Sequence, residues 1–197
     1  MPIALSVKGE QWAYELSSYK NSSSTSARTS LAVGLGAVLW RWLDTHETCL
    51  MEHAGVREFP LVVPVPSTRN RAGHPLPDIL QNTVKPTSGR CADLLSPNPR
   101  YPGESRDAHD DRFLASRQLN GEPVMLIDDQ WTSGGHAQSA AAALKLAGSG
   151  PVAVVPLGRH FDRKPSGDQY QQAAERYYRS ARARGWRWTE CCLCRHP

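Results

Sequence analysis

Residues 124–135, VMLIDDQWTSGG, constrain the fold of this chain more than any other stretch. Four apolar residues without alternation are typical of a strand that is buried on both faces, as strands of parallel sheets are. An alanine-rich run at 136–147 follows, ends at Gly148, and is succeeded by a further apolar run at 152–157. Strand, helix and strand within about 35 residues predict a right-handed βαβ unit of a parallel sheet.

Weaker patterns predict further elements on either side of this unit. Apolar residues recur at helical spacing over 31–43, with Ser30 as a candidate N-cap, and residues 61–65 form a short strand that prolines end. Shorter helices are expected at 77–84 and 169–183, whereas the serine-rich first 27 residues read as a polar lead-in. We therefore expect an α/β protein with an open, mostly parallel sheet flanked by helices.

At 197 residues and 40% hydrophobic composition, the chain can bury one core. We divide it into an N-terminal helical segment packed on the core (1–50), a core (51–165), and a C-terminal helix with a cysteine-rich tail (166–197). Residues 86–112 show little periodicity, and a loop of this length within a compact domain predicts a flexible lid.

Charge and cysteine content exclude several classes of protein. The 23 basic and 19 acidic residues give a net charge of +4, too small to predict nucleic-acid binding unless clustered, but suited to an anionic small ligand. The chain shows neither a signal-peptide pattern nor an apolar run of about 18 residues, so no membrane association is expected. Five cysteines, three of them in the tail, argue against a secreted disulfide framework and favour the cytoplasm.

The acid pair Asp128–Asp129 is expected at the carboxyl edge of the sheet, where open α/β folds bind ligands. Two carboxylates there suit the vicinal hydroxyls of a sugar or a divalent cation. Thr132 to Gly135 offer hydroxyls and backbone N–H groups, and with the N-terminus of the following helix they can cradle a phosphate. A diol site beside a phosphate site predicts a ribose 5-phosphate ligand; the alternative is a plain turn between strand and helix.

These residues resemble a known family. VMLIDDQWTSGG is similar to the phosphoribosyl diphosphate (PRPP) signature of type I phosphoribosyltransferases: apolar residues, an acid pair, two variable residues, then T-T-G-A-T. LVVPVPSTRNR resembles the strand and diphosphate loop of the ComF-type branch, and RDAHDDRF resembles a weakened form of its Arg-rich segment. The resemblance covers about residues 55–160.

The resemblance implies transfer of a 5-phosphoribosyl group from PRPP to a nitrogen acceptor, with Mg²⁺ bound to PRPP and diphosphate released; a homodimer is compatible with it. Asp128 and Asp129 would be the catalytic residues and bind the ribose hydroxyls. The 5-phosphate would be bound by Thr132, Ser133, Gly134, Gly135 and His136. The diphosphate would be bound by Ser67, Thr68, Arg69 and Arg71.

The sequence also departs from that family. His136 stands where a threonine is usual, and Thr132 stands where 6-oxopurine salvage enzymes have an aspartate, so such salvage is not expected. The N-terminal zinc ribbon of ComF-type proteins, with its paired C-x-x-C motifs, is missing. The alternative function is therefore a non-catalytic PRPP-binding regulator or a ComF-type accessory of DNA uptake.

Two further features leave alternatives open. The tail TECCLCRHP and Cys49, which lies at helical spacing from His46, allow a zinc site joining Cys49 to Cys191 and Cys194; a frayed terminus with unused thiols is the preferred interpretation. Trp131 within the ligand loop is expected either to stack on a bound base or to wedge the loop against the core.

Overall fold

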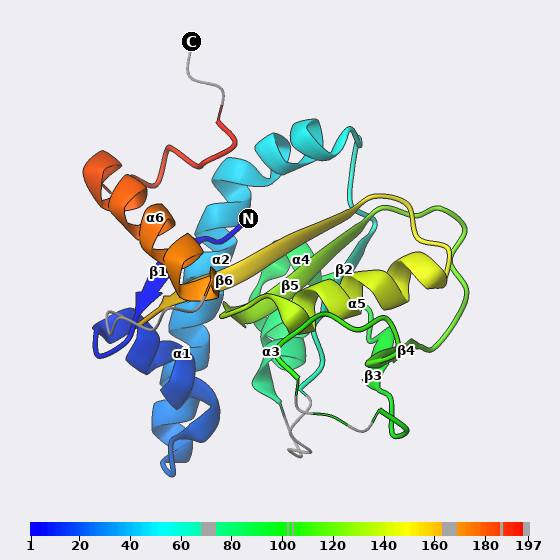
Figure 1. The fold of residues 1–197 in the computed structure, drawn as a ribbon, viewed down its shortest axis with the longest axis horizontal. Coiled ribbons are helices and arrows are strands. Elements are labelled where there is room, and N and C mark those ends of the chain that lie inside the picture. The colour runs from blue at the N-terminus through cyan, green and yellow to red at the C-terminus, as the bar shows by residue number, and fades with distance from the viewer. Residues whose placement is uncertain (68–73, 102, 104, 163–168, 186, 195–197) are drawn as a thin grey trace.

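The computed structural model describes residues 1–67, 74–101, 103, 105–162, 169–185 and 187–194. Its centre is a four-stranded sheet of order β1-β6-β5-β2 in which all three pairings are parallel (Figure 1). The strands are β1 (Ala4–Val7), β2 (Leu61–Pro64), β5 (Val124–Trp131) and β6 (Val152–Phe161). A separate antiparallel hairpin joins β3 (Leu95–Pro97) to β4 (Phe113–Ala115).

Helices flank this sheet, so the predicted α/β class is confirmed. They are α1 (Gln11–Asn21), α2 (Thr25–Ala54), α3 (Pro75–Asp78) with a π-helical turn η1 (Ile79–Thr83), α4 (Lys85–Ser88), α5 (Gly135–Leu146) and α6 (Gln169–Arg184). No helix in the described ranges is long and apolar enough to cross a bilayer.

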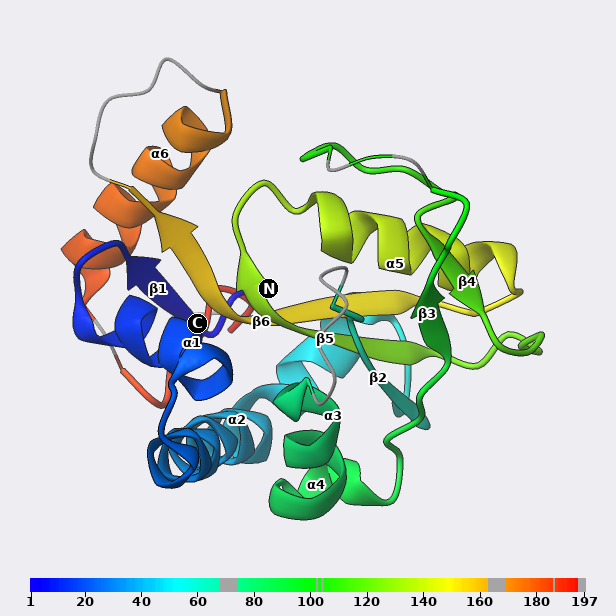
Figure 2. The same cartoon turned by 90° about the horizontal axis from the view of Figure 1, so that it is seen from below.

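The central strand β5 is buried on both faces because helices cover each of them. Met125 and Ile127 join the core formed with α2 and α3, whereas Val124 and Leu126 join the core formed with α5 and the hairpin. Figure 2 shows these two layers, with α5 on one side of the sheet and α2 to α4 on the other. Consecutive strand residues point to opposite faces, so an unbroken apolar run was the correct signal for this strand.

The βαβ unit is confirmed as β5–α5–β6, but β5 is longer than VMLI. It continues through Trp131, which pairs with Arg159 of β6, so the acid pair lies within the strand rather than after it. On its other side β5 loses its neighbour at Pro64, where β2 ends. Asp128 and Asp129 therefore border the space beyond the carboxyl end of β2.

The first 27 residues are not a polar lead-in. They supply β1, which pairs with β6, and α1, which buries Leu16 and Tyr19 completely. Helix α2 also begins earlier than expected: Ser24, not Ser30, is its N-cap and accepts a hydrogen bond from the backbone N–H of Ala27 at 3.3 Å. Most serines of this region are exposed. Its serine-rich composition therefore obscured the pattern of the few residues that pack on the core.

The predicted lid, residues 86–112, contains more regular structure than its composition suggested. It includes most of α4, all of β3, and a loop held by the buried Arg112, which donates to the Ser105 carbonyl at 2.7 Å and the Tyr101 hydroxyl at 3.0 Å. The loop lies against α5, since the His109 backbone N–H donates to Ser139 Oγ at 2.8 Å.

Two glycines of α2 test this packing. A Cβ at exposed Gly34 meets nothing within 4 Å, whereas a Cβ at buried Gly36 would lie 2.8 Å from the Thr83 methyl group of η1. Gly34→Ala should raise the free energy of unfolding by about 0.5–1 kcal/mol, because alanine favours helix. Gly36→Ala should be less stable than Gly34→Ala by about 1 kcal/mol or more, measured by urea unfolding; equal effects would contradict the α2–η1 contact.

Candidate functional site

A cavity of about 340 Å³ lies at the carboxyl end of β2 and β5. Asp128 and Asp129 of β5 line it, together with Lys20 of α1, Ser67 after β2, and His136 of α5. The volume is in the range of small-molecule sites. The structure thus brings the predicted acid pair, one residue of the predicted diphosphate loop and one of the phosphate loop around a single space.

Asp129 is held by three side chains. Its Oδ2 accepts hydrogen bonds from the Tyr19 hydroxyl at 2.7 Å and Lys20 Nζ at 2.5 Å, and His74 Nε2 lies 3.6 Å away. Burial alone would raise the pKa of Asp129, but the His74 and Lys20 contacts and the Tyr19 hydrogen bond outweigh it and hold that pKa below its ordinary value. Asp129 is therefore a fixed anion on the cavity wall.

Asp128 has the opposite character. Burial, and then the neighbouring charge of Asp129, raise the pKa of Asp128 to about 8. Because neutral pH is close to this pKa, the Asp128 carboxyl group can donate or accept a proton. Two adjacent acids whose environments shift their pKa values in opposite directions are a feature of many acid–base sites.

His74 is oriented by its own backbone neighbour. Its Nδ1 accepts a hydrogen bond from the Leu76 N–H at 3.4 Å, at the N-terminus of α3, so the proton of the neutral ring lies on Nε2. That proton faces Asp129 Oδ2. The ring also makes an edge-on contact with Tyr19, with centroids 6.4 Å apart. His74 thus presents a donor to the site in either charge state.

The predicted phosphate loop turns at a glycine. Gly134, with φ of 90°, is the N-cap of α5, and a Cβ there would collide with the Trp131 ring. A Cβ at Gly135 would collide with the carbonyl of Arg106. Ser133 Oγ donates to that same Arg106 carbonyl at 2.6 Å. Ser133 and Gly135 are therefore in close contact with the backbone at Arg106 and Asp107, while Gly134 is required by its positive φ and by the Trp131 ring.

The structure bears on the alternative that the sequence left open for Trp131. Trp131 packs on Gly134, with the Arg159 guanidinium 6.0 Å from its ring centroid, so it wedges the loop in this structure. Arg159 Nη1 also donates to the Thr132 carbonyl at 2.8 Å, which joins β6 to this loop.

The remaining predicted residues are only partly placed. Thr132 and His136 are exposed, and the His136 ring lies beside Phe113, with centroids 6.4 Å apart. Ser67 lines the cavity, but Thr68, Arg69 and Arg71 lie outside the described residues. The diphosphate loop therefore stays a prediction.

Sequence reasoning missed Tyr19, Lys20 and His74. The first two belong to a helix that was not expected, and their contacts with Asp129 span 110 and 109 residues of sequence. A signal was present in the paired aromatic and basic residues of ELSSYKN, but only the sheet order brings α1 beside β5.

A second cluster lies on α2. His46, Cys49, Cys191 and Cys194 have potential ligand atoms that all lie within 4.8 Å of one another. The structure thus brings together the predicted set Cys49, Cys191 and Cys194 and adds His46, which the sequence interpretation had placed only at helical spacing.

Comparison with known proteins gives no relative: no protein-family model, curated protein or solved structure matches the chain. The sites above are thus interpreted from their own chemistry.

The opposed pKa shifts of the acid pair predict opposed pH dependences. The folded pKa of Asp128, about 8, lies above the ordinary 3.8, so wild-type stability should fall as pH rises from about 4 to 8. Asp128→Asn should therefore gain stability over wild type by on the order of 2 kcal/mol between pH 4.5 and 8.

Asp129→Asn should instead be destabilised at neutral pH, because it leaves the half-buried Lys20 and His74 without their anion. The depressed pKa of Asp129 makes this loss shrink as pH falls below about 4. Urea unfolding at several pH values checks both variants; parallel pH profiles would refute the assignment.

Proposed function

We propose that this chain binds PRPP and transfers its 5-phosphoribosyl group to a nitrogen acceptor, releasing diphosphate. The observation that carries the proposal is that Asp128, Asp129, Ser67 and His136 line one cavity beside the N-terminus of α5. Sugar-diol acceptors and a phosphate-binding helix terminus are the two elements that a ribose 5-phosphate requires.

The acid pair fits two neighbouring hydroxyls. Asp129, held ionised by Lys20, accepts a hydrogen bond from one hydroxyl, and Asp128 can either donate or accept toward the other because its pKa is about 8. Carboxylates beside the ribose would also stabilise positive charge at the anomeric carbon as the bond to diphosphate breaks.

Lys20 and His74 supply donors for an anionic leaving group. Both line the cavity, and the side chains of Lys20 and His74 are only 21% and 15% exposed. A charge-assisted hydrogen bond to diphosphate is strong in such a sheltered place. Lys20 of α1 thus contributes positive charge to the site. The family resemblance had assigned this role to Arg69 and Arg71.

The cavity also fits a magnesium ion carried by the ligand. Mg²⁺ is usually bound through one or two carboxylates and substrate phosphates, with water completing an octahedron. Asp128 offers such an oxygen, while Oδ2 of Asp129 is already shared with Lys20 and Tyr19. The ion would neutralise charge on the diphosphate.

One observation favours a second candidate, a protein that binds PRPP without transferring it. Ser133 Oγ and the face of Gly135 contact the carbonyl of Arg106, which carries partial negative charge where the 5-phosphate is expected. If phosphate displaced the Arg106 carbonyl from Ser133 and Gly135, the backbone at Arg106 would have to move. Ligand binding would then be converted into a conformational signal.

Titration calorimetry of PRPP with Mg²⁺ tests binding. We expect a micromolar dissociation constant, equivalent to about −8 kcal/mol, that is lost in Asp128→Asn/Asp129→Asn. The matched control is Asp110→Asn/Asp111→Asn, the same two substitutions in an exposed acid pair, which should bind like wild type. Absence of binding to wild type would refute both candidates.

Diphosphate release then separates the two candidates. Release that depends on an added nitrogen acceptor supports the transferase, and Lys20→Gln should lower its rate at least tenfold by removing a donor to the leaving group. Tight binding without release across a panel of nucleobases, amines and free ammonia supports the binding protein.

A further inference from the structure

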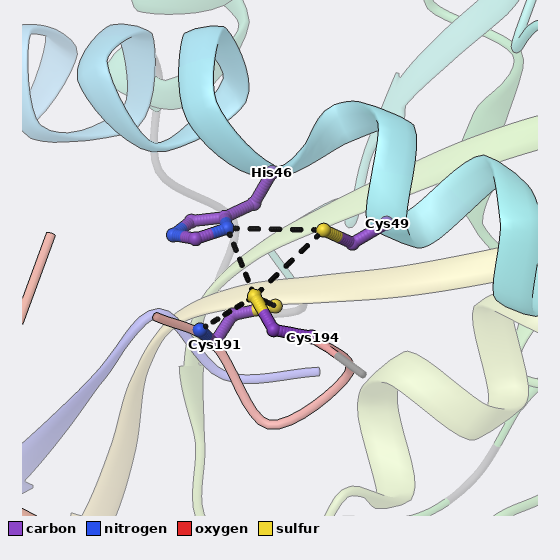
Figure 3. Close-up of side chains that lie close together, drawn as sticks. All are labelled: His46, Cys49, Cys191 and Cys194. Atoms are coloured by element: carbon purple, nitrogen blue, oxygen red, sulfur yellow. Dashed lines mark hydrogen bonds between the residues drawn. The ribbon is translucent and has the colours of Figure 1, made fainter. Parts of the chain in front are cut away.

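The cluster on α2 is built from two separated pairs. His46 and Cys49 are three residues apart on α2 and so project from one face of the helix, while Cys191 and Cys194 close a turn in the C-terminal segment. Figure 3 shows the three sulfur atoms and the imidazole pointing toward one common space. An H-x-x-C pair facing a C-x-x-C pair has the spacing of a structural metal site.

Four of the six distances between ligand atoms are 3.3–4.0 Å, near those around a tetrahedral ion, and the other two are within 4.8 Å. Zinc–sulfur bonds of about 2.3 Å place sulfur ligands about 3.8 Å apart, and a nitrogen ligand slightly nearer. Cys49 Sγ lies 3.8 Å from Cys194 Sγ, and Cys194 Sγ lies 3.3 Å from Cys191 Sγ. His46 Nδ1 lies 3.7 Å from Cys194 Sγ and 4.0 Å from Cys49 Sγ.

His46 is also oriented as a ligand. Its Nε2 lies 2.8 Å from the Trp188 carbonyl, and a carbonyl can only accept, so Nε2 carries the proton. The lone pair is then on Nδ1, the atom that faces the sulfurs. A backbone carbonyl that fixes the other nitrogen is the usual outer partner of metal-bound histidine. The ring is nearly buried, at 2% exposure, and tilts against Trp42.

We propose that His46, Cys49, Cys191 and Cys194 bind one structural zinc ion. Three sulfurs and one nitrogen suit Zn²⁺, while hard cations prefer oxygen. Four protein ligands leave no position for water or substrate, so the ion has a structural rather than catalytic role. A Cys191–Cys194 disulfide would account for two of these residues but would leave the placement of Cys49 and His46 unexplained.

The role of the ion is to fasten the C-terminal segment to the long helix. Residues 187–194 form turns without regular structure, and Leu193 is the residue of that segment that packs on the main core. A link between residues so distant in sequence lowers the conformational entropy of the unfolded chain strongly, as a disulfide would. None of its four residues lines the cavity beside Asp128 and Asp129.

Metal content of the full-length protein tests the proposal. Purified with Zn²⁺ present and then dialysed, wild type should hold about one zinc per chain by elemental analysis and native mass spectrometry. Cys49→Ser and Cys194→Ser should each lower retained zinc at least tenfold. The matched control is Cys192→Ser, which changes an exposed neighbour in the same turn and should keep the wild-type content.

Replacement of the histidine distinguishes a ligand from a packing residue. His46→Cys should retain zinc as a four-cysteine site, whereas His46→Ala should lose it. Cobalt-loaded wild type should show the visible absorption of a tetrahedral thiolate complex, with the band altered in His46→Cys.

X-ray absorption at the zinc edge tests the ligands in the wild-type protein. Its result does not depend on whether any variant folds. It should report three sulfurs near about 2.3 Å and one nitrogen near about 2.0 Å. The proposal is overturned if wild type retains no zinc, if the shell contains only oxygen and nitrogen, or if Cys49→Ser and Cys192→Ser retain equal zinc.

Discussion

The costliest feature of this fold is the burial of two adjacent carboxyl groups in its central strand, and the ion pair between Lys20 and Asp129 offsets much of that cost. An uncompensated charge at Asp129 would be strongly unfavourable, since the residue is only 8% exposed. The Tyr19 hydroxyl donates a hydrogen bond to the same carboxylate, and His74 Nε2 lies 3.6 Å from it. Among the residues that the structure describes, no cation forms an ion pair with Asp128, and its pKa is raised instead. At this edge of the sheet, Asp129 is therefore ionised throughout the neutral range, whereas the protonation of Asp128 changes near neutral pH.

The parts of the fold that sequence predicted are those decided locally. The apolar run before Asp128, the alanine-rich helix and the next strand follow each other directly, so periodicity and a glycine stop at Gly148 were enough to identify the βαβ unit. The position of the acid pair beside a cavity followed from the same unit. Its inclusion within β5 did not, because strand length depends on how far β6 continues alongside.

Elements that depend on distant pairing were not predictable in this way. β1 has only four residues and α1 is rich in polar residues, and they gain their stability from β6 and α2 rather than from their own pattern. Lys20 was missed for this reason. His46 was missed as a ligand because its spacing to Cys49 is common on helices. Only its contact with the Trp188 carbonyl, through Nε2, shows that Nδ1 is available to a metal.

Pairing between β1 and β6 also has a consequence for biosynthesis. Ala4 of β1 meets Gly158 of β6, so the first strand leaves the ribosome long before its partner exists. Until then α1 cannot settle beside β5, and the carboxylate of Asp129 lacks its cation. Non-local contacts of this kind form slowly and leave apolar surface exposed meanwhile. The nascent chain therefore acquires its cavity only after β6 has been made and has paired with β1.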